Sequence, residues 1–196
     1  MSQVLRRPPS RMTLNEFLAW EPGSTDGARW QLVDGEPVAM APASSPHGEI
    51  QSELARLIGN HLLRLQSPCR LVSNPGIVPR VGSDVNYRIP DLGVTCARPT
   101  QDLMMPEPVL LVEILSPSNE LETRANVWAY TTIPSVQEIL IVDSTRMAAE
   151  MLRRQPDGSW SEQPERLGAP AELVLSGIGF STPLAALYRT TFLAAV

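Results

Sequence analysis

Val109-Leu110-Leu111-Val112-Glu113-Ile114-Leu115 is a near-continuous apolar run interrupted by one carboxylate. Its length suits a β-strand, and a strand without apolar–polar alternation is typical of a sheet centre that is covered on both faces. An isolated ionised carboxylate in such a place costs several kcal/mol unless it is paired or binds a cation. Glu113 is therefore either a residue that emerges at the sheet edge or pairs with one arginine, or part of a functional site.

A second carboxylate, Asp91, follows Pro90 at the head of a strand predicted over residues 89–96. The proline partly fixes the backbone there, and on its own the aspartate could be an ordinary turn residue. On neighbouring strands, however, Asp91 and Glu113 could share one hard cation. Mg²⁺ is typically held by one or two carboxylates together with waters and phosphate oxygens.

The rest of the chain predicts a mixed sheet flanked by helices, an α/β (α+β) fold. Asp34-Gly35 is a strong turn signal inside an N-terminal hairpin over residues 30–40. One helix is predicted over residues 12–20, with Thr13 as its cap, and a second from Ser45-Pro46 to about residue 65. Two more are predicted over residues 119–131 and 184–193, and an apolar tail is the alternative for the last. Strands are predicted over residues 70–73, 76–81, 138–142 and 171–175, with a hairpin over 147–160. Residues 1–11 are expected to form a flexible N-terminus and residues 12–196 one domain with added C-terminal strands.

Composition limits the classes of protein. The chain has 196 residues, 43% hydrophobic and 19% charged, enough for a sizeable core. It has no apolar run long enough to span a membrane and no secretory signal, so we expect a cytoplasmic protein. Cys69 and Cys96 are expected to be reduced, buried hydrophobic residues.

The net charge of −5 argues against a general nucleic-acid binder but not against a nuclease, because a bound cation can hold phosphate locally. The chain contains no lysine, and all 16 basic residues are arginine.

Other polar and aromatic residues favour packing. His61 lies on the apolar face of the helix that begins at Ser45-Pro46, so we interpret it as a packed histidine. The four tryptophans lack a spacing that suggests base stacking, and core or hairpin packing is expected for them.

Five motifs in order resemble the Uma-two family of restriction endonucleases, a branch of the PD-(D/E)XK nuclease superfamily. They are Gln31-Leu32-Val33-Asp34-Gly35, Pro46-His47, Ile89-Pro90-Asp91-Leu92-Gly93-Val94, Val112-Glu113-Ile114-Leu115-Ser116-Pro117-Ser118, and Trp128-Ala129-Tyr130 before Ile133-Pro134-Ser135. The resemblance covers roughly residues 12 to 145. It implies a restriction-endonuclease-like fold, with a mixed central sheet flanked by helices, and divalent-metal phosphodiester hydrolysis.

Carried over one residue at a time, the resemblance implies that Asp91 and Glu113 are metal ligands, with the Ile114 carbonyl as a third candidate. Ser116 belongs to a Ser-Pro-Ser turn that leads into the next helix, which Ser118 or Asn119 opens. His47 opens the first long helix, where it either touches the site or contributes to packing.

Two positions depart from the family pattern. The family usually has glutamate where this chain has Gln31, and lysine where this chain has Asn126, four residues before Tyr130. Arg88 and Arg124 are the cations considered in place of the lysine, although Arg124 points to another helix face than Asn126. Arginine is a poor proton acceptor but can stabilise developing negative charge.

The sequence thus predicts a DNA endonuclease that uses Mg²⁺ or Mn²⁺, with Gln31 and Asn126 tuning the site and with weakened activity. The alternative is a catalytically inactive protein of the same fold that acts as a nucleic-acid-binding or dimerising module. A hydrolase of another phosphoester is a third hypothesis. A homodimer is expected as the arrangement common among proteins that cut both strands of a duplex.

Overall fold

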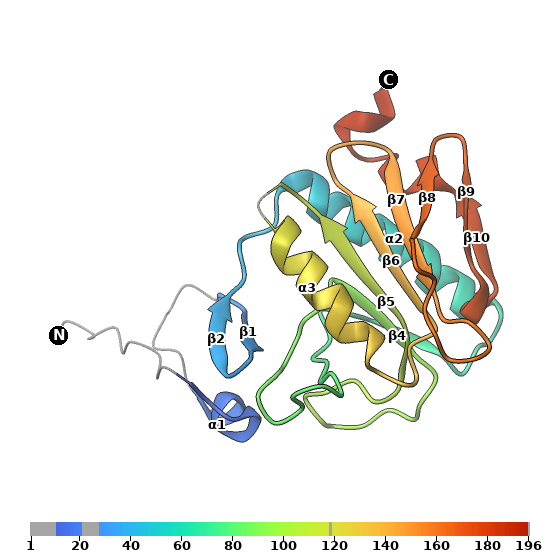
Figure 1. Cartoon of the computed structure of the whole chain (residues 1–196). Coiled ribbons are helices and arrows are strands. Elements are labelled where there is room, and N and C mark those ends of the chain that lie inside the picture. Colours follow the sequence, from blue (N-terminus) through green and yellow to red (C-terminus); the bar gives the residue numbers. More distant parts are fainter. Residues whose placement is uncertain (1–10, 21–27, 118, 196) are drawn as a thin grey trace.

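A six-stranded mixed sheet forms the centre of the computed structural model, which describes residues 11–20, 28–117 and 119–195 (Figure 1). The strand order is β3-β4-β5-β6-β7-β8. Only β5 and β6 are parallel, and the other neighbouring pairs are antiparallel. The bounds are β3 Arg70–Ser73, β4 Leu92–Thr95, β5 Pro108–Leu115, β6 Glu138–Asp143, β7 Ala148–Arg153 and β8 Glu165–Gly168. The predicted mixed sheet, with the apolar run as an inner strand, is confirmed.

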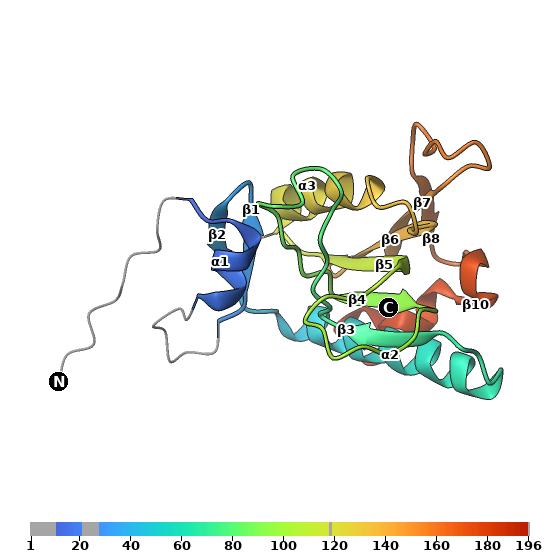
Figure 2. The ribbon, with the colours of Figure 1, turned by 90° about the horizontal axis from the view of Figure 1, so that it is seen from below.

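Helices cover both faces of the sheet (Figure 2). Helix α2 (Ser45–Arg64) packs on one face, against Leu110, Val112 and Ile114 of β5. Helix α3 (Glu120–Thr131) packs on the other face, against Leu111. Because side chains alternate along a strand, Glu113 points toward α3.

The N-terminal elements form a small unit beside the sheet. Helix α1 (Leu14–Ala19) begins with a capping box between Thr13 and Glu16. Strands β1 (Trp30–Val33) and β2 (Glu36–Ala39) form the predicted hairpin, in which both turn residues, Asp34 and Gly35, have positive φ. A backbone bridge from Leu32 to Tyr87 ties the hairpin to the segment that leads into β4. Gln31 thereby comes close to the head of β4.

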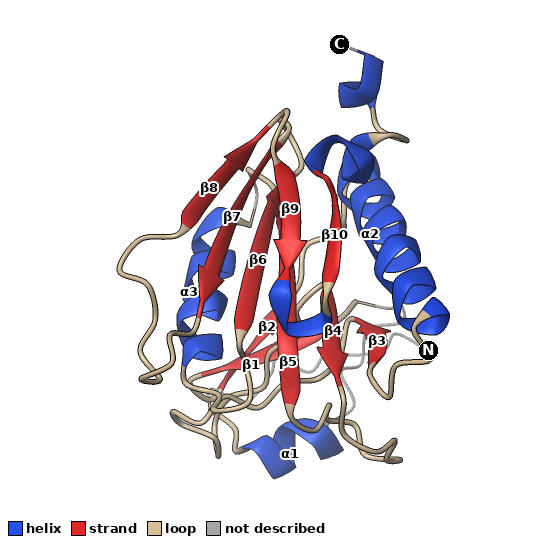
Figure 3. Cartoon of the chain, turned by 90° about the vertical axis from the view of Figure 1, so that its right-hand side faces the viewer, coloured by secondary structure: helices blue, strands red, loops and turns tan. Residues whose placement is uncertain are grey.

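A second hairpin, β9 (Glu172–Leu175) with β10 (Phe180–Pro183), lies next to α2 on the same face (Figure 3). The 3₁₀ helices Ser176–Ile178, Leu184–Tyr188 and Phe192–Ala195 accompany it. His61 Nε2 lies 3.0 Å from the Ile178 carbonyl oxygen, and its ring meets Phe180 edge-on. The prediction of a packed His61 is confirmed.

The structure corrects several expected boundaries. Residues 76–81 form isolated bridges at Gly76 and Ile77 rather than a strand, since Pro79 lacks the N–H that pairing requires. The hairpin predicted over 147–160 is confirmed and extends further than expected: an antiparallel Arg154–Trp160 bridge closes the turn at Asp157-Gly158, and the returning chain continues to β8, which pairs antiparallel with β7. Strand β10 was not predicted, because only four residues separate Gly179 from Leu184. Helix α2 is capped by Ser44, one residue earlier than expected.

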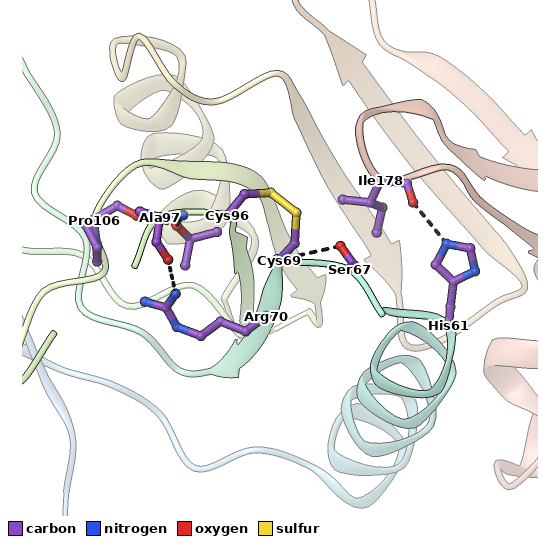
Figure 4. Close-up of a disulfide and its surroundings, with 9 residues drawn as sticks. His61, Ser67, Cys69, Arg70, Cys96, Ala97, Pro106 and Ile178 are labelled. Atoms are coloured by element: carbon purple, nitrogen blue, oxygen red, sulfur yellow. Dashed lines mark hydrogen bonds between the residues drawn. A yellow bond between two sulfur atoms is a disulfide. The ribbon is translucent and has the colours of Figure 1, made fainter. Parts of the chain in front are cut away.

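The expected pair of reduced, buried cysteines is wrong. Cys69 and Cys96 form a disulfide beside the β3–β4 pair, and Cys96 is exposed (Figure 4). They come together because β3 and β4 are antiparallel and Arg70 pairs with Thr95, one residue inward from each cysteine. Pairing of this kind depends on strand register, which two isolated cysteines do not reveal.

One tryptophan also differs from its expected place. Trp20 and Trp30 pack edge to face, and Trp160 lies under the Arg154 guanidinium. Trp128, in contrast, is 63% exposed on the outer side of α3. The helical period turns it away from the neighbouring core residues Val127 and Tyr130.

Candidate active site

Glu113 is a buried carboxylate in the middle of the sheet. Its side chain is held from α3: the Tyr130 hydroxyl donates to Glu113 Oε1 at 2.7 Å, and Asn126 Nδ2 donates to the same oxygen at 3.3 Å. Burial, and then the nearby charge of Asp91, raise the pKa of Glu113 well above its ordinary value, against the effect of both hydrogen bonds. No arginine within the described residues forms an ion pair with it. Glu113 therefore neither emerges at the sheet edge nor pairs with an arginine.

Asp91 lies next to Glu113, immediately before the first residue of β4. Leu92 pairs with Val112, so Asp91 lies one residue beyond the end of β4 and beside Glu113. Its carboxylate accepts a hydrogen bond from the Ile114 N–H at 2.7 Å and contacts His47 Nε2 at 2.8 Å. The sequence left open whether His47 touches the site, and the structure places it in contact.

Gln31 and Asn126 meet beside these carboxylates. Gln31 is fully buried, and its Oε1 accepts from the Ile89 N–H at 3.0 Å and from Asn126 Nδ2 at 3.3 Å. Gln31 Nε2 donates to the carboxylate of Glu122. The Oδ1 atom of Asn126 is buried and has no hydrogen-bond partner among the described residues. The two positions that depart from the family pattern are thus in direct contact.

The turn after β5 is fixed by Asn119. Its Oδ1 accepts from the Ser116 N–H at 2.7 Å, and its Nδ2 donates to the Ile114 carbonyl at 3.2 Å. Asn119 is the N-cap of α3 by position but makes no side-chain cap bond, and Ser118 lies outside the described residues. A carbonyl oxygen has two lone pairs, so the Ile114 carbonyl keeps one for a further partner.

Neither of the two arginines proposed as substitutes for lysine forms an ion pair with Asp91 or Glu113 within the described residues. Arg124 pairs with Glu150 on β7, which takes it away from the site as its helix face requires. Arg88 is buried, and its Nη2 donates to Asn86 at 2.9 Å. Burial raises the pKa of Glu122 above its ordinary value, against the smaller, lowering effects of the Gln31 hydrogen bond and the charge of Arg88. Neither arginine lines the pocket described next.

A pocket of about 630 Å³ joins these groups, within the usual size range of ligand sites. It is lined by Ala28, Arg29, Gln31, Ala39, Met40, Ala41, Pro42, Ala43, His47, Gln51, Asn74, Ile89, Asp91, Glu113, Ser116, Asn119, Glu122, Thr123 and Asn126. Three carboxylates and one arginine, Arg29, are among these residues.

Sequence reasoning missed two charged members of this pocket. Glu122 precedes Asn126 by four residues and therefore lies on the same helix face, a signal that was present in the sequence. Arg29 stands just before the hairpin and follows no motif that would have drawn attention to it.

Comparison with known proteins assigns the chain to a family. The model of the Uma2 family, described as "Putative restriction endonuclease", matches residues 14–185. The chain belongs to the Uma2 family. The match includes the hairpin with Gln31, both carboxylate strands and α3.

Relatives and a solved structure agree with this assignment. Two Synechocystis proteins named uncharacterized protein slr1290 and uncharacterized protein sll1609 are 30% and 26% identical to this Uma2 chain. The matches cover 93% and 84% of the chain, and 94% and 93% of those proteins. The structure of a "putative nuclease belonging to DUF820" from Anabaena variabilis superposes with a TM-score of 0.72 at 18% identity, covering 91% of this chain and 98% of that one. The expected restriction-endonuclease-like fold is confirmed.

No helix in the described part of the chain has the length and apolar character needed to cross a membrane.

Proposed function

We propose that this chain is a divalent-metal-dependent endonuclease that hydrolyses DNA phosphodiester bonds. The observation that carries the proposal is that Asp91, just before β4, and Glu113, on the neighbouring strand β5, lie side by side at one pocket. The family and the nuclease fold support the same reading.

The residues at the pocket fit a hard divalent cation such as Mg²⁺ or Mn²⁺. Such ions take oxygen ligands, and the pocket offers the carboxylates of Asp91 and Glu113. The Oδ1 atom of Asn126 is a further buried acceptor, without a hydrogen-bond partner in the part of the chain that the structure describes, and a buried acceptor left unsatisfied costs about 1–3 kcal/mol. A cation would also offset the repulsion between the two carboxylates that raises the pKa of Glu113.

The surrounding residues hold the candidate ligands in place. Asp91 is fixed from two sides by the Ile114 N–H and by His47, and Glu113 by Tyr130 and Asn126. When bound, a divalent cation polarises the phosphate and lowers the pKa of an attacking water. Arg29 is the pocket cation available to a substrate phosphate, in a chain without lysine. We expect activity to be weak, because Gln31 and Asn126 are neutral.

A plasmid-nicking assay with Mn²⁺ tests this function. We expect wild-type protein to nick DNA, and Asp91→Asn and Glu113→Gln to reduce the rate by about a hundredfold or more, since metal binding contributes several kcal/mol to catalysis. Glu36→Gln is the matched control, because it removes the same charge from an exposed position on β2. Loss of nicking in Glu36→Gln, or full nicking in the two site variants, would contradict the proposal.

The second candidate is a catalytically inactive module that binds nucleic acid or dimerises. The absence of lysine and the neutral Gln31 and Asn126 favour it. Fluorescence polarisation with labelled DNA separates the two functions. DNA binding that needs no divalent cation, together with absence of nicking, would support the inactive module.

A further inference from the structure

Helix α2 contacts Asp91 at two points, one helical turn apart. His47 Nε2 lies 2.8 Å from Asp91 Oδ1, and Gln51 Nε2 donates to the Asp91 carbonyl oxygen at 2.8 Å. An ionised carboxylate only accepts hydrogen bonds, so Nε2 of His47 is the donor. Residues four apart are neighbours on one helix face. A single face of α2 therefore holds both the side chain and the main chain of Asp91, and all three residues line the pocket.

A further contact with Asp91 comes from Asn74, directly after β3. The Asn74 N–H donates to the Asp91 carbonyl oxygen at 2.9 Å, and Gln51 Nε2 lies 3.4 Å from Asn74 Oδ1. Asn74 has a φ of 51°, in the left-handed region, which asparagine adopts more readily than most residues. Backbone conformations of this sparsely populated kind cluster at functional sites. The turn at Asn74 thus supports both Asp91 and the glutamine that contacts it.

Every oxygen atom of Asp91 has a donor as a result. Oδ1 accepts from His47, Oδ2 accepts from the Ile114 N–H at 2.7 Å, and the carbonyl oxygen accepts from Gln51 and Asn74. Two donors use both lone pairs of the carbonyl oxygen, so only the carboxylate keeps capacity for a ligand. Because each carboxylate oxygen is bonded, the group cannot rotate without breaking a hydrogen bond. Its orientation is therefore fixed before a ligand binds.

We propose that His47 and Gln51 are positioning residues, through which α2 holds Asp91 in the orientation that binds the divalent cation. Neither residue is assigned a contact with the cation itself. Partners that orient a metal ligand in this way typically change metal affinity or activity by about 10–100-fold when they are lost. The inference rests on the proposed function, because it concerns a ligand of the same site.

Mn²⁺ titration of the metal-free protein tests this role without any activity measurement. We expect isothermal titration calorimetry to show that His47→Phe, which keeps a ring but removes the donor, weakens Mn²⁺ binding roughly tenfold or more. His47→Gln keeps an N–H donor and should recover most of the lost affinity. Gln51→Met removes only a donor to the main chain. It should weaken Mn²⁺ binding less than His47→Phe does, because Asn74 still donates to that carbonyl oxygen.

The second histidine of the chain provides the matched control. His61 is also buried on α2, and its Nε2 also lies at an oxygen atom, the Ile178 carbonyl, but outside the pocket (Figure 4). His61→Phe makes the same chemical change and should leave the Mn²⁺ affinity equal to that of wild type. A merely structural His47 would behave in the same way: His47→Phe would change the melting temperature of the metal-free protein and not its Mn²⁺ affinity.

The outcomes separate this inference from the function on which it rests. If Asp91→Asn abolishes Mn²⁺ binding while His47→Phe and Gln51→Met bind as wild type does, α2 does not position Asp91 for the cation and the proposed function stands. Equal weakening in His47→Phe and His47→Gln would also overturn the inference, because the donor would then have no part in the effect. Equal weakening in His61→Phe would do the same, since the loss would then reflect general stability. If wild type binds no Mn²⁺, both the inference and the proposed function fail.

Discussion

Tyr130 is the residue that fixes the central carboxylate. Its hydroxyl donates to Glu113 at 2.7 Å, and both side chains are buried. Tyr130→Phe would leave Glu113 with the longer bond from Asn126 alone. We expect metal-free Tyr130→Phe to lose about 1–3 kcal/mol of unfolding free energy in urea titration, the cost of a buried acceptor that loses its donor.

A second tyrosine provides the control for this prediction. Tyr87 donates to the Leu103 carbonyl at 3.4 Å, a much weaker contact near the surface. Tyr87→Phe should therefore cost less than about 0.5 kcal/mol. Equal losses in the two variants would mean that the Tyr130–Glu113 bond has no special place in the stability of the site.

Arg29 is predicted to help hold substrate phosphate. It is exposed and is the only arginine among the described residues that line the pocket. We expect Arg29→Ala to reduce plasmid nicking by about tenfold or more while leaving Mn²⁺ affinity unchanged, because it would act on the substrate rather than on the cation. Arg64→Ala is the control: this exposed residue ends α2, whose first turns line the pocket. A similar loss of nicking in both variants would indicate only a general charge effect.

How far single residues could be predicted depends on how unusual their surroundings are in sequence. Glu113 could be singled out because a charge inside an apolar strand demands an explanation, and the structure shows it buried beside Asp91. Glu122 could not, because acidic residues are ordinary in the first turn of a helix. Arg124 is held away from the pocket by Glu150, whereas Arg88, bonded to Asn86, is not among the pocket-lining residues but lies near enough to Glu113 and Glu122 for their charges to interact.

At the scale of elements, Glu53 ties α2 to the C-terminal segment. It is buried and accepts hydrogen bonds from Arg56 and Arg189. The Arg56 bond, more than the Arg189 bond, lowers the pKa of Glu53 below its ordinary value of 4.5. A carboxyl with a lower pKa in the folded state stabilises the fold fully above its unfolded pKa, and this contribution is lost as pH falls through the folded value.

We predict that Glu53→Gln, which removes the charge facing Arg56 and Arg189, lowers stability by an amount that depends on pH. At pH 7 we expect a cost of about 1 kcal/mol, kept small because both arginines are largely exposed. Urea titrations should show the difference from wild type shrinking as the pH falls below about 4.5. A difference that stays constant to acid pH would show that packing, and not the charge of Glu53, carries the effect.

Helices and strands could be predicted where one local pattern in the sequence was sufficient. The turn Asp34-Gly35 and the apolar run of β5 give clear local patterns, and the structure has a hairpin and an inner strand there. The prediction of a strand over residues 76–81 was wrong. Extended, apolar residues need a neighbouring segment with free N–H and C=O groups to become a strand, and the sequence does not show that neighbour. The Cys69–Cys96 disulfide was not predicted for a related reason: strand register brings the two residues together.

At the scale of the whole molecule, the candidate site joins parts that are distant in sequence. The sheet supplies Asp91 and Glu113, α2 supplies His47, the N-terminal hairpin supplies Gln31 and α3 supplies Asn126. A cation that binds among these parts binds only the folded chain, so it must stabilise the whole domain. At a Mn²⁺ concentration a hundredfold above its dissociation constant, the gain is about 2.7 kcal/mol.

We therefore expect Mn²⁺ to raise the melting temperature of the wild-type chain by about 5–10 °C, as measured by differential scanning calorimetry. The Asp91→Asn/Glu113→Gln variant should show no such rise. Its metal-free melting temperature should not fall far below that of wild type, because the substitutions also remove the repulsion between two buried carboxyl groups. Ca²⁺ at the same concentration tests the size of the site, since this larger ion prefers more oxygen ligands. An equal rise in the double variant would place the stabilising cation elsewhere on the molecule and would separate metal binding from the two carboxylates.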